Sequence, residues 1–357
     1  MVLADLGADV IRIDRAGSVG PAPGTASFDV LGRGRRSVAV DLKSPGGADV
    51  VLRIVEGAGA LLEGFRPGVA ERLGIGPAAC LARNPRLVYG RMTGWGQEGP
   101  LADAAGHDIT YAAVAGALAH IGRAGQLPTP PLNLVADFGG GGMLLALGLV
   151  AGLLHAERTG TGQVVDAAMV DGTALLMAPF FGASAVGFWS DERGTNLLDS
   201  GAPFYDVYRC SDGLELAVGA IEPQFFAALL AVLELDPAAV PPQDDRDRWP
   251  ELRATLTETL ARRPRAEWLD LAEGRDACLA PVLTMAQAAS HPHVAARGTI
   301  VEVDGVPQPA PAPRFSTTPA ALGRRPAVPG EHTDEILQEA GLSSDEIARL
   351  RQDGVIA

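Results

Sequence analysis

Two short segments of the chain combine acid–base side chains with the predicted starts of helices. Residues 106–111 place the imidazole of His107 just before a helix, and residues 133–139 place the carboxylate of Asp137 at a glycine run that opens an apolar helix. Unpaired backbone N–H groups and the helix dipole favour an acid at such a position, and they could also bind a developing oxyanion. Position alone favours a plain N-cap for Asp137 and a capping or core histidine for His107, so neither residue by itself indicates a site.

Other common site types are missing from the sequence. The glycines at 139–142 are followed by Met143, so they do not complete a dinucleotide-binding fingerprint, and there is no Walker A, HExxH or GxSxG sequence. His107 and Asp108 together resemble a metal-binding pair, but no further histidine lies at ligand spacing. The sequence therefore predicts no metal site.

Composition and charge restrict the class of protein. The chain has 357 residues, of which 47% are hydrophobic and 20% charged, which is typical of a soluble globular protein with more than one lobe. The net charge of −14 argues against nucleic acid or an anionic membrane as a partner. The longest apolar run, residues 143–156, is shorter than the ~20 residues of a membrane-spanning helix. With no signal peptide and three scattered cysteines, we expect a cytoplasmic protein.

The basic residues are almost all arginine. Of 29 lysine and arginine residues, only Lys43 is a lysine. Two explanations remain open: one lysine left by chance in a GC-rich coding sequence, or a compact ammonium group required at residues 41–43.

The order of predicted elements indicates an α/β fold. Strands are expected at 9–13, 37–40, 60–65 and 87–89, with a helix at 44–56 that Ser44 caps and Pro45 opens. This alternation is typical of a parallel sheet. Further along we expect strands at 163–169, 205–209 and 214–218 and helices near 143–156, 223–233, 251–261, 266–271 and 344–352.

Polar and proline-rich stretches suggest the domain limits. We expect a large α/β domain at 1–186, a linker at 187–204, a small α+β domain at 205–305 and a C-terminal return to the large domain at 306–357. The return begins with a proline-rich stretch at 308–313, expected to be a linker.

A set of motifs spread over the chain resembles a known family. From residue 3 to the C-terminus the chain is similar to the family III CoA transferases, and within them to the α-methylacyl-CoA racemase branch. The resemblance implies a large Rossmann-like lobe, a smaller α+β lobe and an interlocked homodimer. The motifs lie in order at residues 5–10, 63–69, 93–97, 106–111, 135–141, 163–172 and 218–225.

The resemblance also implies catalytic roles. His107 and Asp137 match two bases on opposite faces of the substrate α-carbon, Glu222 matches the acid that pairs with the histidine, and Asn133 matches a polar neighbour. The implied reaction inverts the 2-methyl centre of an acyl-CoA by 1,1-proton transfer through an enolate, in fatty acid or lipid metabolism. It needs no cofactor, because CoA is part of the substrate. The acyl group stays open among branched fatty acyl, sterol side-chain and arylpropionyl thioesters.

Further positions match residues that line the CoA. An acidic protein must gather its few cations locally to bind the phosphates of CoA, and arginine suits phosphate. The matching positions are Arg15, Val40, Asp41, Leu42, Lys43, Gly64, Phe65, Arg66, Arg72, Gly106, Asp108, Ile109, Thr110 and Tyr111.

Two alternatives use the same fold. In a CoA transferase, Asp137 would attack the thioester and form a mixed anhydride, with no need for a second base. His107 and Glu222 favour the racemase over this alternative. A catalytically silent CoA-binding protein is disfavoured because all the acid–base positions are filled.

The chain departs from the family at its start. Family members begin further upstream, with a strand and a Gly/Pro loop ahead of the helix that ends near residues 5–7. We therefore expect the first strand of the main sheet to be missing, from a misplaced start codon or a truncated gene, with a loss of stability and activity.

Overall fold

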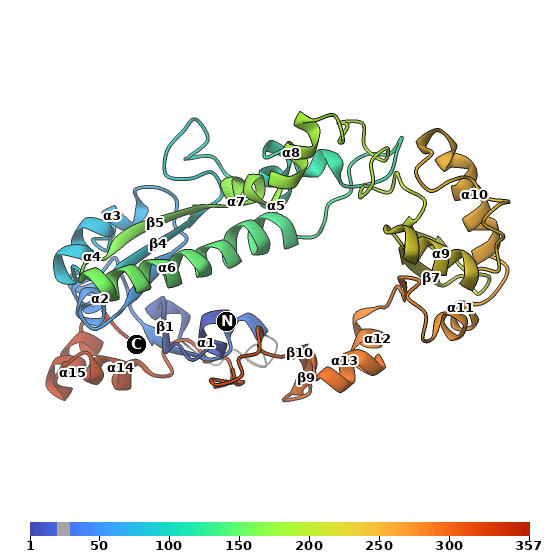
Figure 1. Ribbon diagram of the computed structural model, residues 1–357. Coiled ribbons are helices and arrows are strands. Elements are labelled where there is room, and N and C mark those ends of the chain that lie inside the picture. The colour runs from blue at the N-terminus through green and yellow to red at the C-terminus, as the bar shows by residue number, and fades with distance from the viewer. Residues whose placement is uncertain (20–28) are drawn as a thin grey trace. The chain divides into compact units, whose positions relative to one another are not determined.

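The computed structural model describes residues 1–19 and 29–357 and has a mixed α/β architecture (Figure 1). The chain forms two compact units. Unit 1 contains residues 1–111, 134–173 and 289–357, and unit 2 contains residues 112–133 and 174–288. The limits of these units do not coincide with the domain limits expected at residues 186, 204 and 305. Those domain limits remain predictions.

Unit 1 contains two parallel sheets, as the alternation of elements predicts. Strand β1 (Val10–Asp14) pairs with β2 (Arg35–Ala39), and β4 (Val88–Thr93) lies between β3 (Ala60–Glu63) and β5 (Gln163–Ala168). Helices α2 (Gly47–Glu56), α3 (Val69–Arg72) and α4 (Pro77–Arg83) connect β2, β3 and β4. In a parallel sheet the carboxyl ends of all strands lie at one edge, so the loops that follow them gather there.

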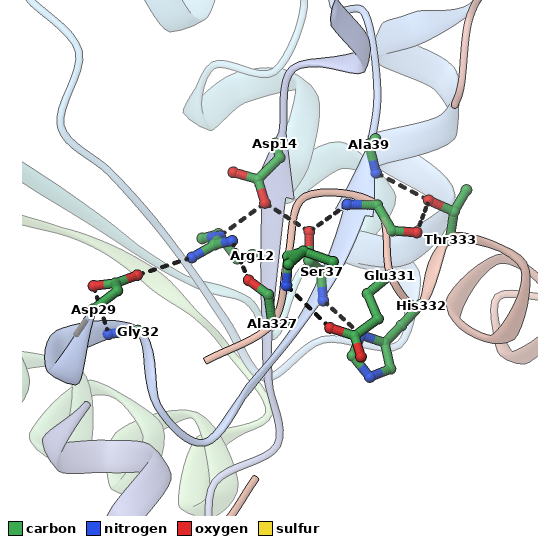
Figure 2. Close-up of polar contacts among 12 residues, drawn as sticks. Arg12, Asp14, Asp29, Gly32, Ser37, Ala39, Ala327, Glu331, His332 and Thr333 are labelled. Atoms are coloured by element: carbon green, nitrogen blue, oxygen red, sulfur yellow. Dashed lines mark hydrogen bonds and ion pairs between the residues drawn. The ribbon is translucent and has the colours of Figure 1, made fainter. Parts of the chain in front are cut away.

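The end of the chain packs on its beginning. Helices α14 (Thr333–Glu339) and α15 (Ser344–Gln352), red in Figure 1, follow a segment that joins β2 through polar contacts drawn in Figure 2. The Ser37 N–H donates to Nδ1 of His332 over 3.3 Å, and the His332 N–H donates to the Ser37 carbonyl over 2.9 Å. Thr333 Oγ1 accepts the Ala39 N–H. These bonds join residues almost 300 positions apart and hold the C-terminal segment on the edge of β2.

A long helical segment covers β4 and β5. It begins as the π-helix η4 (Leu134–Met143) and continues as α6 (Leu144–Thr159). Glycines allow its close approach to the sheet, since a Cβ at Gly152 would lie 2.7 Å from Val88, and one at Gly148 would lie 2.9 Å from Val165. The segment therefore fixes where Asp137, on η4, stands relative to β4 and β5.

The same segment is long and apolar enough to cross a membrane. Leu134–Thr159 has 26 residues, a mean hydropathy of 1.8 and only 28% of its most apolar window buried. The sequence predicted a helix too short to span a membrane, and this prediction was wrong. It counted only the apolar run at 143–156, whereas the helix extends beyond both ends of that run. One such helix is weak evidence for a membrane, since core helices of soluble proteins pass the same test.

Unit 2 is built on an antiparallel sheet. Strand β7 (Glu215–Gly219) pairs with β6 (Tyr205–Arg209) and with β8 (Leu279–Pro281). In β6 buried and exposed residues alternate, which is the pattern of a strand with one face on the core. Helices α9 (Pro223–Val232), α10 (Trp249–Leu260) and α11 (Arg265–Ala272) complete a core that includes Leu216, Leu229, Leu252, Leu256 and Trp268.

Several shorter elements join these parts. They are α1 (Val2–Asp5), η1 (Ala16–Ser18), η2 (Val30–Gly32), α5 (Asp108–Val114), η3 (Leu118–His120), α7 (Met169–Leu176), α8 (Ala178–Ala185), η5 (Arg246–Arg248), α12 (Met285–Ser290), α13 (Pro292–Arg297), β9 (Ile300–Val303) and β10 (Val306–Pro309).

Two local predictions were wrong. The helix expected at Ser44 begins at Gly47, because the Ser44 hydroxyl donates to the Asp41 carboxylate over 2.8 Å instead of capping a helix. The expected linker at 308–313 begins inside the β9–β10 hairpin. Asp304 and Gly305 both have positive φ, as a tight hairpin turn requires, and this Asp-Gly signal was missed.

Candidate active site

His107 stands at the start of α5, where its backbone is fully used and its side chain is left exposed. Its carbonyl accepts the N–H groups of Thr110 at 2.8 Å and Tyr111 at 3.2 Å. The Thr110 hydroxyl accepts the N–H of His107 at 2.9 Å, so the side-chain hydrogen bond at this helix start comes from Thr110 and not from His107. The imidazole is therefore presented from a fixed backbone.

Asp137 lies half-buried in the first turn of η4, and it is not the N-cap that its position in the sequence allowed. The carboxylate of Asp108 takes that role: its Oδ2 accepts the N–H groups of Ala136 and Asp137, each at 2.8 Å. These two N–H groups are therefore not available for an oxyanion, contrary to the expectation that this glycine-rich start would leave them bare.

The glycine run after Asp137 serves close packing. A Cβ at Gly140 would lie 2.6 Å from the backbone nitrogen of Thr173, and one at Gly172 would lie 1.9 Å from the Gly140 carbonyl oxygen. Backbone of η4 therefore touches backbone of α7, and no side chain fits between them. This contact fixes η4 and the Asp137 that it carries.

The ring of Tyr111 packs tightly against two glycines and a tryptophan. Its ring passes so close to Gly94 and Gly106 that a Cβ would lie 2.1 Å from it at the first position and 2.4 Å at the second. Trp95 meets the ring edge-on with centroids 4.8 Å apart. Burial raises the pKa of the Tyr111 hydroxyl, the Asp137 carboxylate raises it further and Arg66 lowers it. Arg66, Tyr111 and Asp137 thus share one electrostatic environment.

The positions expected to line CoA follow the carboxyl ends of strands, where ligands of α/β sheets bind. Arg15 follows β1, residues 40–43 follow β2 and residues 64–66 follow β3, with Arg72 on α3. The side chains of Arg15, Lys43, Arg66 and Arg72 are exposed. The structure thus places four cations on loops and a helix at these ends.

The loop that carries Arg66 is held by buried ionic contacts. Oε2 of Glu63 accepts the Phe65 N–H at 2.6 Å, and its Oε1 accepts Nε of Arg91 at 3.1 Å. Arg91 also bonds Glu71 at 2.9 Å. Burial raises the pKa of Glu63, and Arg91 opposes this shift. Sequence reasoning missed Arg91, because it lies beyond the strand predicted at 87–89 and no local pattern indicates its partners.

The loop that carries Lys43 is organised by Asp41. Its two oxygens accept the Lys43 N–H at 2.9 Å and the Ser44 hydroxyl at 2.8 Å, and these bonds lower its pKa. Val40 is buried and bridges to Ile356 at the end of the chain. In this loop Asp41 holds the turn, while the exposed Lys43 ammonium is the group suited to a phosphate.

Glu222 and Asn133 belong to unit 2. Glu222 is the N-cap of α9, yet its side chain makes no capping hydrogen bond and is exposed. Gln243 donates to the carbonyls of Ala220 and Ile221 at 3.1 and 2.7 Å and fixes this turn beside a cavity of about 550 Å³. Asn133 is exposed and precedes η4 in the chain. The predicted partnership of both residues with His107 and Asp137 stays a prediction.

Among the described residues, no group of three or more histidine, cysteine, aspartate or glutamate side chains is arranged to hold a metal ion. The arrangement in unit 1 offers instead an exposed imidazole, a half-buried carboxylate and loops that carry cations. Such a set can move protons on an anionic substrate.

Comparisons with known proteins show what the chain is similar to. The model of CoA-transferase family III matches residues 1–333. α-Methylacyl-CoA racemase from Mus musculus is 46% identical over 359 residues, covering 100% of this chain and 92% of that protein, and the Homo sapiens enzyme is 46% identical over 362 residues with the same coverage. Acetyl-CoA:oxalate CoA-transferase from Acetobacter aceti is 33% identical over 322 residues, covering 86% of this chain and 82% of that protein.

Solved structures share the fold over nearly the whole chain. A CAIB/BAIF family protein from Brucella suis has a TM-score of 0.81 and 26% identity, covering 95% of this chain and 93% of that one. Rv3272 from M. tuberculosis has a TM-score of 0.74 and 29% identity, covering 93% and 92%.

Proposed function

The chain belongs to CoA-transferase family III, and from this premise we propose that it inverts the 2-methyl centre of acyl-CoA thioesters, as an α-methylacyl-CoA racemase. The family predicted from the sequence motifs is confirmed. The observation that carries the proposal is the 46% identity to two racemases over the whole chain. The presence of both bases, His107 and Asp137, supports it.

In the proposed reaction, one base removes the α-proton and the conjugate acid of the other returns a proton on the opposite face. Neutral His107 and ionised Asp137 serve as bases for opposite enantiomers, and each proton transfer is worth roughly 10²–10⁴-fold. The intermediate enolate needs a hydrogen-bond donor, worth ~10²–10³-fold. Because the N–H groups of Ala136 and Asp137 already bond Asp108, another group supplies this donor in the proposed reaction.

Binding of the substrate rests on its CoA portion. We propose that Arg15, Lys43, Arg66 and Arg72 bind the phosphates, since all four are exposed at the carboxyl ends of strands or just beyond. The chemistry needs no cofactor, because the thioester itself acidifies the α-carbon.

Proton exchange tests the proposal against the CoA-transferase alternative. Each enantiomer of a 2-methylacyl-CoA is incubated in deuterated water, and both α-deuterium and configuration are followed. We expect inversion to collapse in His107→Ala and in Asp137→Asn, with exchange surviving from one enantiomer only and from opposite enantiomers in the two variants. A transferase using Asp137 as nucleophile would instead keep transfer to a free carboxylate in His107→Ala. Equal residual exchange from both enantiomers in both variants would overturn the two-base scheme.

A second copy of the chain is the proposed partner. Four apolar side chains form a stripe along one side of the η4–α6 segment: Met143 (54% exposed), Leu147 (64%), Val150 (51%) and Leu154 (47%). Their spacing of four, three and four residues is that of a helix face that packs on another surface. A monomer rarely leaves such a stripe in water. We propose that a homodimer covers it, as the family resemblance implies.

The dimer has a test of its own. In the interlocked arrangement that the resemblance implies, Glu222 of one copy serves His107 of the other. Co-expression of His107→Ala with Glu222→Ala should then give mixed dimers that are more active than either variant alone, because one of their two sites is intact. A monomer by light scattering would contradict the proposal.

We also propose a cytoplasmic location. All three cysteines lie in the described part of the chain and are free thiols, with Cys80 and Cys210 buried and Cys278 exposed. A free exposed thiol suits a reducing compartment. Labelling of intact against lysed cells with a membrane-impermeant thiol reagent tests this location.

A further inference from the structure

The carboxylate of Asp108 joins the two segments that carry the bases. Asp108 is 4% exposed, follows His107 directly in the chain and stands in the first turn of α5. Its Oδ2 accepts the N–H of Asp137 itself and that of the preceding Ala136. His107 is the residue before Asp108, and Asp137 itself donates one of the two hydrogen bonds. Both bases are therefore linked to the Asp108 carboxylate through the backbone.

The second oxygen of this carboxylate is unusual. Oδ1 of Asp108 is buried and has no hydrogen-bond partner in the part of the chain that the structure describes. A buried charged group with an unused oxygen is costly, and such exceptions in native proteins call for an explanation.

Asp199 shows what a purely structural carboxylate does in this molecule. It is 6% exposed, and its Oδ1 accepts the N–H groups of Asn196 at 2.8 Å and Gly201 at 3.2 Å. Its Oδ2 accepts the N–H of Gly194 at 2.9 Å and the Asn196 amide at 2.7 Å. Both oxygens are satisfied within one turn. Asp108 instead uses one oxygen to reach a segment 28 residues away and leaves the other unpaired.

We infer that Asp108 is a positioning residue: its carboxylate fixes the backbone of Asp137 against that of His107 and so holds the two bases on opposite faces of the substrate. This inference rests on the proposed racemase function. It assigns to the Asp108 side chain a task other than contact with CoA. The negative charge suits the task, because a carboxylate stabilises the start of η4, where N–H groups point out of the helix.

The expected consequence concerns the balance between exchange and inversion. A shift of about 1 Å between reacting groups can cost about 10²-fold in rate. In Asp108→Ala the base that takes the α-proton still works, but the acid on the opposite face is displaced. The proton then returns from the same face, so the substrate exchanges without inverting. We expect kcat for inversion to fall about 10²-fold, the ratio of exchange to inversion to rise at least tenfold and KM to change little.

Two further variants at this position keep the test decisive if Asp108→Ala folds poorly. Asp108→Asn retains an oxygen that can accept both N–H groups and should stay near the wild-type ratio. Asp108→Glu retains the charge but moves the carboxylate outward by one methylene, and it should raise the ratio. The matched control is Asp199→Ala, which also removes a buried carboxylate that binds backbone N–H groups. It should lower exchange and inversion together and leave their ratio unchanged.

The outcomes separate the inference from the proposed function. A wild-type enzyme that inverts its substrate, with Asp108→Ala and Asp108→Glu at the wild-type ratio, would overturn the positioning role alone. A wild-type enzyme that shows neither exchange nor inversion with a 2-methylacyl-CoA panel would overturn the proposed function, and the inference with it.

Discussion

Two helices of unit 1 begin with the same kind of hydrogen bond, from the N–H of the cap residue to the side chain three residues further on, but with different residues at the cap. At α15, Ser343 and Glu346 cap each other: the Ser343 hydroxyl accepts the Glu346 N–H, and the Glu346 carboxylate accepts the Ser343 N–H at 2.8 Å. At α5, Thr110 accepts the His107 N–H in the same way, but the residue at the cap position is a histidine. The cap of α15 uses both side chains, whereas the cap of α5 leaves the imidazole exposed.

The two helix starts use the residue at the cap position differently. A serine at a cap position stabilises the helix, and histidine is not among the residues that favour it. Glu222 repeats the pattern in unit 2, since it is the N-cap of α9 and makes no side-chain capping bond. Other N-caps of the chain, among them His291 and His332, also make no side-chain capping bond, so the roles proposed for His107 and Glu222 are tested by changing one kind of helix start into the other.

The largest expected effect comes from His107→Ser, which converts the start of α5 into one like that of α15. The free energy of unfolding should rise by up to about 1 kcal/mol, because serine is a good cap. Inversion should fall at least 10²-fold, because a base is lost. Thermal denaturation and a chiral assay of the acyl-CoA product measure the two changes. A variant that is less stable and still active would contradict the functional interpretation of this start.

A smaller effect is expected from Glu222→Gln. Glutamine keeps the shape of the side chain, and the backbone cap of α9 does not depend on it, so stability should be unchanged. Inversion should fall less than in His107→Ser, because the proposed role of Glu222 is to hold the imidazole and not to move the substrate proton. Comparison of kcat for the two variants checks this order.

The same variant has a second measurable consequence. Burial raises the pKa of the Cys278 thiol, and the Glu222 carboxylate raises it further. Removing that charge lowers the pKa, so more thiolate is present at a given pH and labelling by a disulfide reagent should be faster. Unchanged labelling kinetics would show that the Glu222 charge does not act on the Cys278 thiol.

How far the sequence predicts this structure depends on whether local residues satisfy local groups. Strand β6 and helix α15 were predicted to the residue, because alternation and a capping box act within a few positions. The predicted start of α2 was wrong, because the Ser44 hydroxyl bonds Asp41 instead of capping the helix. Asp108 was matched to CoA and not to Asp137, because its two hydrogen bonds cross 28 and 29 residues and no local pattern encodes them.

The smallest expected effect, from Ser343→Ala, completes the comparison from the structural side. Loss of the cap should lower the free energy of unfolding by about 1 kcal/mol and leave inversion unchanged.

The capping bonds lower the pKa of Glu346, so the stabilisation that depends on its charge is present above the ordinary carboxyl pKa and is lost as the pH falls through the lowered one. The difference in stability between the wild type and Ser343→Ala should therefore shrink in acid. Denaturant titrations at neutral and acidic pH measure this difference, and a gap of constant size would show that the Glu346 charge contributes nothing to the cap. Activity lost in proportion to stability would show instead that α15 and the site are coupled.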